Sequence, residues 1–235
     1  MTADYTFPPR TMTFAELTAA GGLKLGGYDL ARTRRFLTLI HNCQREQSWR
    51  LDNLAHVAGV IGHFTERDDG VTVQLLDRWL ECRALSRSAF AEVLIMLWRT
   101  ILSMPTAVRP ASWWVGMWRL AAVEPATEEP VTCFRGGGAP YIGMSWTPQL
   151  EFAAKHAINA RLRGTTTAPL VVGTEVEPAA VLWRGATRTT ANGIIPWLVE
   201  EIVVDPTMLG AVRVMGEVTA ENGWRPRAGE VLADA

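Results

Sequence analysis

Residues 133–157 read CFRGGGAPYIGMSWTPQLEFAAKHA, and this stretch decides how the second half of the chain is interpreted. Arg135 stands at the end of a short apolar run that is typical of a strand, and three glycines follow it directly. A Ser-Trp-Thr-Pro sequence then opens a segment of helical periodicity, for which Thr147 is a suitable N-cap and Pro148 a suitable first residue. The pattern predicts a strand, a loop and a helix over residues 147–164.

Upstream of this stretch the sequence predicts helices. Thr13 and Glu16 have the spacing of a capping box at a helix start. Apolar residues recur with a helical period in further segments, which are separated by Gly, Asp or Ser breaks and cover residues 28–43, 49–64, 71–82 and 88–102. We therefore expect an α-helical region over residues 1–122.

The character of the sequence changes at EPATEEP, residues 124–130, where prolines and acids interrupt the apolar pattern. Beyond this point, runs rich in valine and isoleucine predict strands, in addition to the one at residues 131–136, over residues 168–177, 179–185, 200–206 and 213–220. We place the domain boundary here, which divides the chain into residues 1–122 and 123–235. The expected fold class is α+β.

Composition excludes several classes of protein. With 235 residues and 48% hydrophobic content the chain can bury a substantial core and is not disordered. A net charge of -1 gives no general attraction to nucleic acid or membrane, and no window approaches the roughly 18 apolar residues of a membrane span. The three cysteines are far apart, which argues against a disulfide framework and favours the reducing cytoplasm.

Arg135, Ser145, Thr147 and a glutamate pair, Glu200 and Glu201, are the residues that suggest chemistry. An arginine beside glycines suits a pyrophosphate, because the guanidinium is a charged planar fork and the bare backbone admits a ligand. A serine and a threonine two apart share one face of a strand, and a carboxylate opening an apolar strand can point into a cleft. Each residue taken alone also has a structural explanation, as a strand-end arginine, a helix cap or a solvated charge.

Three motifs in this order resemble those of a known family. They are Phe134-Arg135-Gly136-Gly137, Gly143-Met144-Ser145-Trp146-Thr147 and Glu201-Ile202-Val203-Val204. They resemble the Arg, Ser-x-Thr/Ser and Glu motifs of the ADP-ribosyltransferases of the R-S-E class, which includes cholera-toxin-like, C3-like and many phage-encoded enzymes. The resemblance covers about the last 105 residues.

The resemblance implies two small packed β-sheets with an NAD cleft, NAD as co-substrate and no metal. Arg135 would then bind the pyrophosphate, and the backbone of Gly136 would hold the nicotinamide carboxamide. Ser145 would orient Glu201 by a hydrogen bond, while Thr147 would support the strand and cap the helix. Glu201 would hold the ribose 2′-hydroxyl and stabilise positive charge as the bond to nicotinamide lengthens.

The acceptor of the ADP-ribose is open. Family members that modify a specific side chain usually carry Glu or Gln two positions before the catalytic glutamate, where this chain has Val199, and Glu200 is one place away. We expect mono-ADP-ribosylation of a macromolecule, a protein in preference to nucleic acid, by a bacterial or phage toxin or effector, and no membrane partner. The alternatives are an NAD glycohydrolase and a catalytically inactive interaction protein with this fold.

Other candidate residues support weaker hypotheses. His56 and His63 would lie on one helix face, but no third metal ligand is near them in the sequence. Cys133 is better explained as a small buried residue than as a nucleophile. The tryptophans of SWWVGMW, Trp113, Trp114 and Trp118, are best explained by packing between the two halves of the chain, with an exposed partner-binding patch as the second interpretation. The basic step at Arg32, Arg34 and Arg35 is best explained as a solvated helix face, with contact to a nucleic acid or an acidic partner as the alternative.

Overall fold

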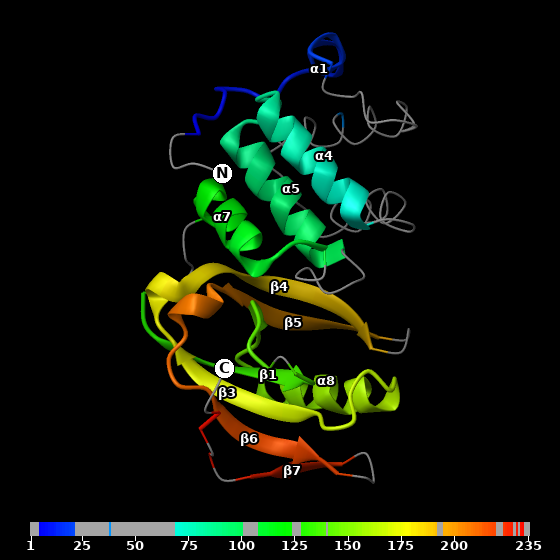
Figure 1. Cartoon of the computed structure of the whole chain (residues 1–235), viewed down its shortest axis with the longest axis vertical. Helices are drawn as coiled ribbons and strands as arrows, with labels where there is room; N and C mark the ends of the chain where they lie inside the picture. The colour runs from blue at the N-terminus through cyan, green and yellow to red at the C-terminus, as the bar shows by residue number, and fades with distance from the viewer. Residues whose placement is uncertain are drawn as a thin grey trace. The chain divides into compact units, whose positions relative to one another are not determined.

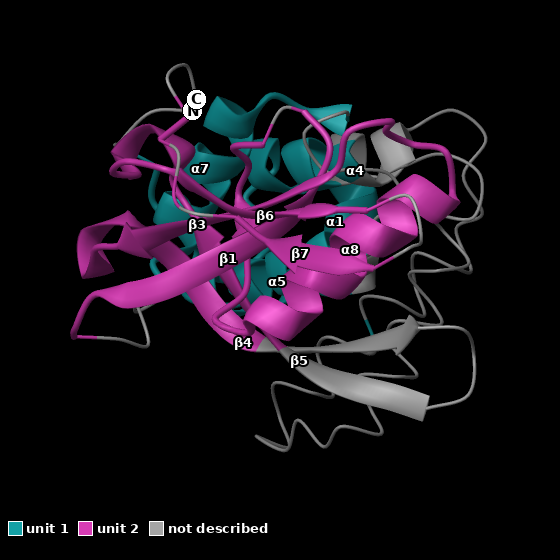
Figure 2. Cartoon of the chain, turned by 90° about the horizontal axis from the view of Figure 1, so that it is seen from below, with its two compact units in different colours: residues 1–122 teal, residues 123–235 magenta. Residues whose placement is uncertain are grey.

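The computed structural model of the chain describes residues 5–21, 38, 69–100, 108–123, 128–139, 141–191, 195–219, 223–227, 229 and 231–232. The chain divides into two compact units, Met1–Ala122 and Val123–Ala235, which we call unit 1 and unit 2 (Figure 2). Unit 1 contributes helices and unit 2 contributes two small antiparallel sheets, so the α+β class is confirmed. None of the described helices has the length and apolar character that crossing a bilayer would require.

The described part of unit 1 is helical. Its elements are α1 (Phe14–Ala19), α4 (Asp69–Glu81), α5 (Arg87–Thr100) and α7 (Ala111–Ala121) (Figure 1). The rings of Trp114 and Trp118 on α7 are almost fully buried and meet Trp98 of α5 edge to face, at centroid distances of 5.3 and 5.9 Å. These two tryptophans therefore belong to the core of unit 1. The helices expected over residues 28–43 and 49–64, with His56, His63 and the three arginines near residue 33, lie outside the described residues apart from Thr38.

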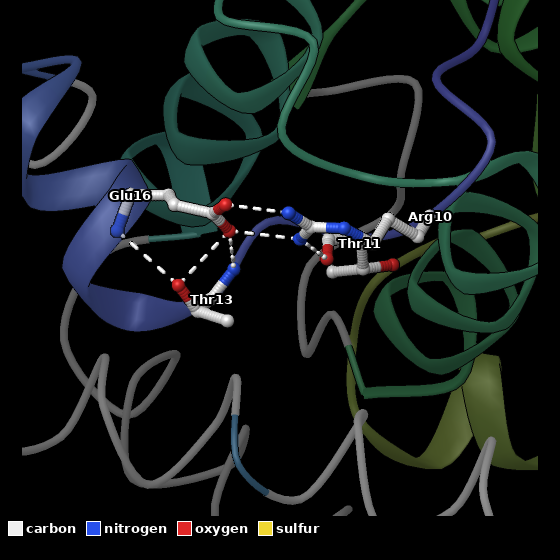
Figure 3. A network of polar contacts seen from close by, with 4 residues as sticks. All are labelled: Arg10, Thr11, Thr13 and Glu16. Atoms are coloured by element: carbon white, nitrogen blue, oxygen red, sulfur yellow. Dashed lines mark hydrogen bonds and ion pairs between the residues drawn. The ribbon is translucent and has the colours of Figure 1, made fainter.

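The start of α1 confirms the predicted capping box. The Thr13 hydroxyl accepts a hydrogen bond from the Glu16 amide, and the Glu16 carboxylate accepts one from the Thr13 amide at 2.8 Å (Figure 3). Arg10 donates two further bonds to the same carboxylate, at 2.5 and 2.8 Å. The hydrogen bonding from Arg10 is the largest cause that holds the pKa of Glu16 well below its ordinary value, followed by that from Thr13. All of these groups are at the surface, so the network serves the helix end.

Unit 2 contains two antiparallel sheets (Figure 1). The four-stranded sheet has the order β1-β3-β6-β7, and the three-stranded sheet has the order β2-β5-β4. The strands of the first are β1 (Val131–Gly137), β3 (Leu170–Val176), β6 (Arg213–Val218) and β7 (Trp224–Pro226). Those of the second are β2 (Ser145–Trp146), β4 (Val181–Ala191) and β5 (Ile195–Val204), and short 3-10 turns precede β4 and follow β5 at Pro178–Ala180 and Pro206–Met208. A bridge between Phe134 and Thr147 joins β1 to the end of β2.

Helix α8 (Leu150–Leu162) and the three-stranded sheet cover opposite faces of the four-stranded sheet. Successive residues of β3 show this, because Val171 packs against the alanines of α8 whereas Val172 packs against Trp146 and Ile202 of the other sheet. A strand that is buried on both faces is expected to be rich in apolar residues along its length, and the valines of β3 agree with this. The bridge from β1 to the end of β2 and the pairing of β2 with β5 connect the strands on which the candidate residues lie.

Several element boundaries differ from the expected ones. Helix α8 has Gln149 as its N-cap and begins at Leu150, so the prediction that Thr147 caps it was wrong. The reason is that residues 145–147 are held as a strand by pairing with β5 and β1. Strand β4 continues to Ala191 and strand β5 begins at Ile195, so both are longer than expected. Strand β7 was not predicted because it is three residues long and ends in proline.

Candidate active site

Arg135 lies on β1, on the face that carries the buried Cys133 two residues earlier. Its Nη1 donates a hydrogen bond to the main-chain oxygen of Ser145 at 2.8 Å. Desolvation by the surrounding protein lowers the pKa of the guanidinium, while the nearby Glu201 carboxylate opposes this shift. An arginine stays protonated under such a shift, so the structure holds a partly buried positive charge beside a carboxylate.

Ser145 connects this arginine to Glu201. Its hydroxyl donates to Glu201 Oε1 at 2.6 Å, while its carbonyl oxygen accepts from Arg135. The sheet register explains the contact, because Ser145 lies opposite Val203 on β5, and Glu201 precedes Val203 by two residues on the same face. Three residues that are far apart in the sequence are thus brought together by β1, β2 and β5.

Glu200 lies on the other side of β5 from Glu201. The register is continuous here, with Gly185 opposite Glu201 and Ala186 opposite Glu200, so no bulge turns the two carboxylates to one side. Glu200 accepts a hydrogen bond from the guanidinium of Arg184 and forms an ion pair with it. Val199 pairs with Thr187 in the same register, and its side chain lies outside the described part of the structure.

Thr147 takes part in the site through its backbone. Its amide and carbonyl exchange hydrogen bonds with those of Phe134, at 2.9 and 2.7 Å, which ties β2 to β1. Its hydroxyl accepts from the amide of Gln149 at 3.2 Å and is buried in the turn before α8. Thr147 therefore fixes the distance between the strands that carry Arg135 and Ser145.

Gly136 allows α8 to approach β1 closely. A Cβ atom at this position would lie 1.8 Å from the carbonyl oxygen of Ala153 and 2.9 Å from the amide nitrogen of Ala157. A side chain here would therefore overlap the helix backbone. The glycine has a packing role, whether or not its backbone also meets a ligand.

His156 is a candidate residue that the sequence analysis did not single out. It lies on the exposed side of α8, and its ring meets that of Phe152 edge to face at 4.7 Å. Its pKa is lowered by desolvation first and then by the positive charge of Arg135, while the Glu201 carboxylate opposes this shift, so the charge of the ring interacts with both groups. The one sequence feature that could have pointed to His156 was its place in the helix that follows Thr147.

Cys133 is unsuited to nucleophilic chemistry. It is fully buried on β1, and desolvation is the main cause that raises the pKa of its thiol to about 12. A thiol with such a pKa carries almost no thiolate at neutral pH. The interpretation of Cys133 as a small core residue agrees with this environment.

The Arg135, Ser145 and Glu201 arrangement combines a fixed cation, an orienting hydroxyl and a carboxylate. The cation and its N–H donors can bind an anion such as a phosphate or a carboxylate, whose oxygens match the planar guanidinium. The oriented carboxylate can stabilise a positive charge that develops on a bound substrate.

Comparisons of the chain with models of protein families, with curated proteins and with solved structures found no match.

Proposed function

We propose that unit 2 is a mono-ADP-ribosyltransferase domain that uses NAD as its co-substrate. The observation that carries the proposal is the double role of Ser145, which contacts Arg135 through its carbonyl and Glu201 through its hydroxyl. The order of these residues along the chain matches the motif order of the R-S-E class of ADP-ribosyltransferases. The packed pair of small sheets is the scaffold that this resemblance implies.

In this proposal each residue has a separate role. Arg135 binds the pyrophosphate of NAD, and Glu201, held by Ser145, contacts the 2′-hydroxyl of the nicotinamide ribose. The bond between C1′ and the nicotinamide nitrogen breaks, and its electron pair leaves with nicotinamide. The carboxylate stabilises the resulting oxocarbenium-like ribose. A nucleophile of the acceptor then forms a bond to C1′ and releases its proton to solvent.

The acceptor is a macromolecule, with a protein favoured over nucleic acid, and unit 1 is the part of the chain available to recognise it. The wide spacing of the cysteines favours action in a reducing compartment such as the cytoplasm. The position two residues before Glu201 is a valine rather than a second carboxylate or amide.

NAD hydrolysis is a second candidate, and the position of Glu200 favours it. Glu200 is paired with Arg184 on the opposite face of β5 from Glu201, so it does not supply the carboxylate that Val199 lacks. Without a group that orients a protein nucleophile, water can take the acceptor's place. The product would then be free ADP-ribose.

Labelled NAD incubated with the protein and a host-cell lysate tests both candidates. Wild type is compared with Glu201→Gln, and Glu175→Gln serves as the control because Glu175 is an exposed glutamate on β3 of the same unit. Label transfer that is lost in Glu201→Gln alone supports the transferase. Nicotinamide release without transfer supports the hydrolase, and absence of both products from wild type contradicts the proposal and leaves an interaction protein.

Glu200→Gln separates the two candidates further. If Glu200 takes part in binding the acceptor, this variant transfers less label while it still releases nicotinamide. Equal loss of both products would instead indicate that the pair with Arg184 supports the strand. Measuring both products in the same reaction distinguishes these results.

A further inference from the structure

The segment of residues 143–145 is fixed at three successive carbonyl oxygens. The oxygen of Gly143 accepts from the indole Nε1 of Trp146 at 2.7 Å, and that of Met144 accepts from the amide of Val204 at 2.8 Å. The oxygen of Ser145 accepts from Arg135 at 2.8 Å. Trp146 is itself buried between the two sheets. The segment is therefore held by the core, by β5 and by the arginine at the same time.

The guanidinium of Arg135 lies against the first residue of this segment. A Cβ atom at Gly143 would stand 2.8 Å from both Cζ and Nη2 of Arg135, and 3.1 Å from Nη1. Carbon atoms do not approach this closely, so a side chain at this position and the present guanidinium position exclude each other. The backbone has little freedom to retreat because the two carbonyls at residues 143 and 144 are bonded elsewhere.

We infer that residues 143–145, locked by Trp146, form a rigid platform that positions the Arg135 guanidinium for an anionic ligand. Gly143 leaves the space in which the guanidinium lies, and the Ser145 carbonyl sets its direction. Trp146 prevents the platform from moving away. Gly143 and Trp146 are positioning residues that act through Arg135, and the choice of NAD as the ligand rests on the proposed function.

The same platform links the two charged groups of the site. Ser145 uses its backbone for Arg135 and its side chain for Glu201, so a displacement of the segment moves the cation and the carboxylate together. A site that is oriented before the ligand arrives loses less freedom on binding than one that must be ordered. The platform accounts for the short spacing of Gly143, Ser145 and Trp146 in the sequence.

Kinetics of nicotinamide release at varied NAD concentration test the inference. Gly143→Ala is expected to raise KM for NAD about tenfold with little change in kcat, because a charge-assisted contact present throughout the reaction is weakened. Trp146→Phe, which keeps a ring but removes the N–H donor, is expected to raise KM about threefold. Gly210→Ala is the control, since a Cβ atom there meets nothing within 4 Å. An unchanged KM in Gly143→Ala overturns the inference.

A double variant separates positioning from general damage. If Gly143 acts through Arg135, adding Gly143→Ala to Arg135→Ala causes no further loss, because the group that the glycine positions is already absent. A further loss of about tenfold would show that the alanine harms the unit in another way. Thermal unfolding of each variant identifies any that fail to fold.

A crystal structure of Gly143→Ala decides the inference without reference to NAD. The guanidinium is expected to leave the Ser145 carbonyl, and retention of this hydrogen bond overturns the inference even if activity falls. Conversely, a wild type that does not cleave NAD contradicts the proposed function alone. A displaced Arg135 in the variant would then still establish the platform.

Discussion

In unit 1 the ion pair of Arg10 and Glu16 stabilises the start of an exposed helix. In unit 2 Arg135 and Glu201, from two different strands, both form hydrogen bonds with Ser145 on a third strand. The groups of the first network are neighbours in the sequence, and those of the second are up to 66 positions apart. A local network stabilises a local element. The network of Arg135, Ser145 and Glu201 joins residues of three strands, so it forms only when the sheets of unit 2 are complete. It does not stabilise one local element, and this favours a functional role for it.

Glycine shows the same contrast between the units. Gly136 is covered by the backbone of α8, while Gly116 in helix α7 has nothing within 4 Å of its Cβ position. Gly136→Ala is expected to destabilise unit 2 by about 3 kcal/mol, because an overlap with backbone atoms cannot be relieved by a rotamer change. Gly116→Ala is expected to stabilise unit 1 by about 0.5–1 kcal/mol, because alanine favours a helix interior.

Urea unfolding followed by tryptophan fluorescence and circular dichroism measures both changes. Changes of opposite sign in the free energy of unfolding of the two variants would support the contrast between the two glycines. Destabilisation by both substitutions would break it, since it would mean that α7 is as tightly covered at Gly116 as β1 is at Gly136.

Local patterns predicted many of the described elements, but they did not predict β7 or the exact ends of the helices and strands. The capping box at Thr13 and Glu16 and the strand predicted over residues 131–136 rest on patterns among neighbouring residues, which a sequence displays directly. The start of α8 was misplaced because pairing with β1 overrides the helix-capping preference of Thr147. Long-range pairing of this kind is invisible in one sequence.

Deletion of a hydroxyl has different expected results in the two units. Ser145→Ala removes the hydrogen bond to Glu201 but keeps the carbonyl that Arg135 contacts, so the rate of nicotinamide release is expected to fall about 10- to 100-fold. Ser86 caps the start of α5 by accepting from the Ala89 amide and shares a contact with Thr11. Ser86→Ala is expected to cost unit 1 about 1 kcal/mol of stability with no effect on the rate.

Rates and unfolding curves recorded for both serine variants test this prediction. Ser145→Thr keeps the hydroxyl and should retain more activity than Ser145→Ala. If Ser145→Ala instead lowers stability and leaves the rate unchanged, the serine would serve the fold of unit 2 as Ser86 serves unit 1.

The candidate site could be predicted from the sequence only in part. Arg135, Ser145 and Glu201 carry the chemistry, and their residue types and order were visible. Gly143 and Trp146 act through their positions against other residues, and Gly136 acts by letting α8 pack closely on β1. Such roles depend on the packed structure, so residue type alone did not reveal them.

Acid is expected to act on the two units through different groups. The pKa of His156 in unit 2 is lowered from its ordinary value of 6.5, so the unfolded chain takes up the proton first and stability falls as the pH drops below about 6.5. The pKa of Glu16 in unit 1 is lowered from 4.5, so its stabilising contribution is present above that pH and is lost below it. Unit 2 should therefore begin to weaken at a higher pH than unit 1, by a small amount because both side chains are solvent-accessible.

Urea midpoints at pH 7.5, 5.5 and 3.5 measure this order, with His156→Gln and Glu16→Gln as the matched variants. His156→Gln should remove part of the change between pH 7.5 and 5.5 and leave the change at lower pH intact, while Glu16→Gln should do the reverse. High salt should reduce the contribution of Glu16, since its partner Arg10 is exposed as well. An unaltered profile for His156→Gln would mean that the titration of this ring does not affect the stability of unit 2, and would leave the site with Arg135, Ser145 and Glu201 alone.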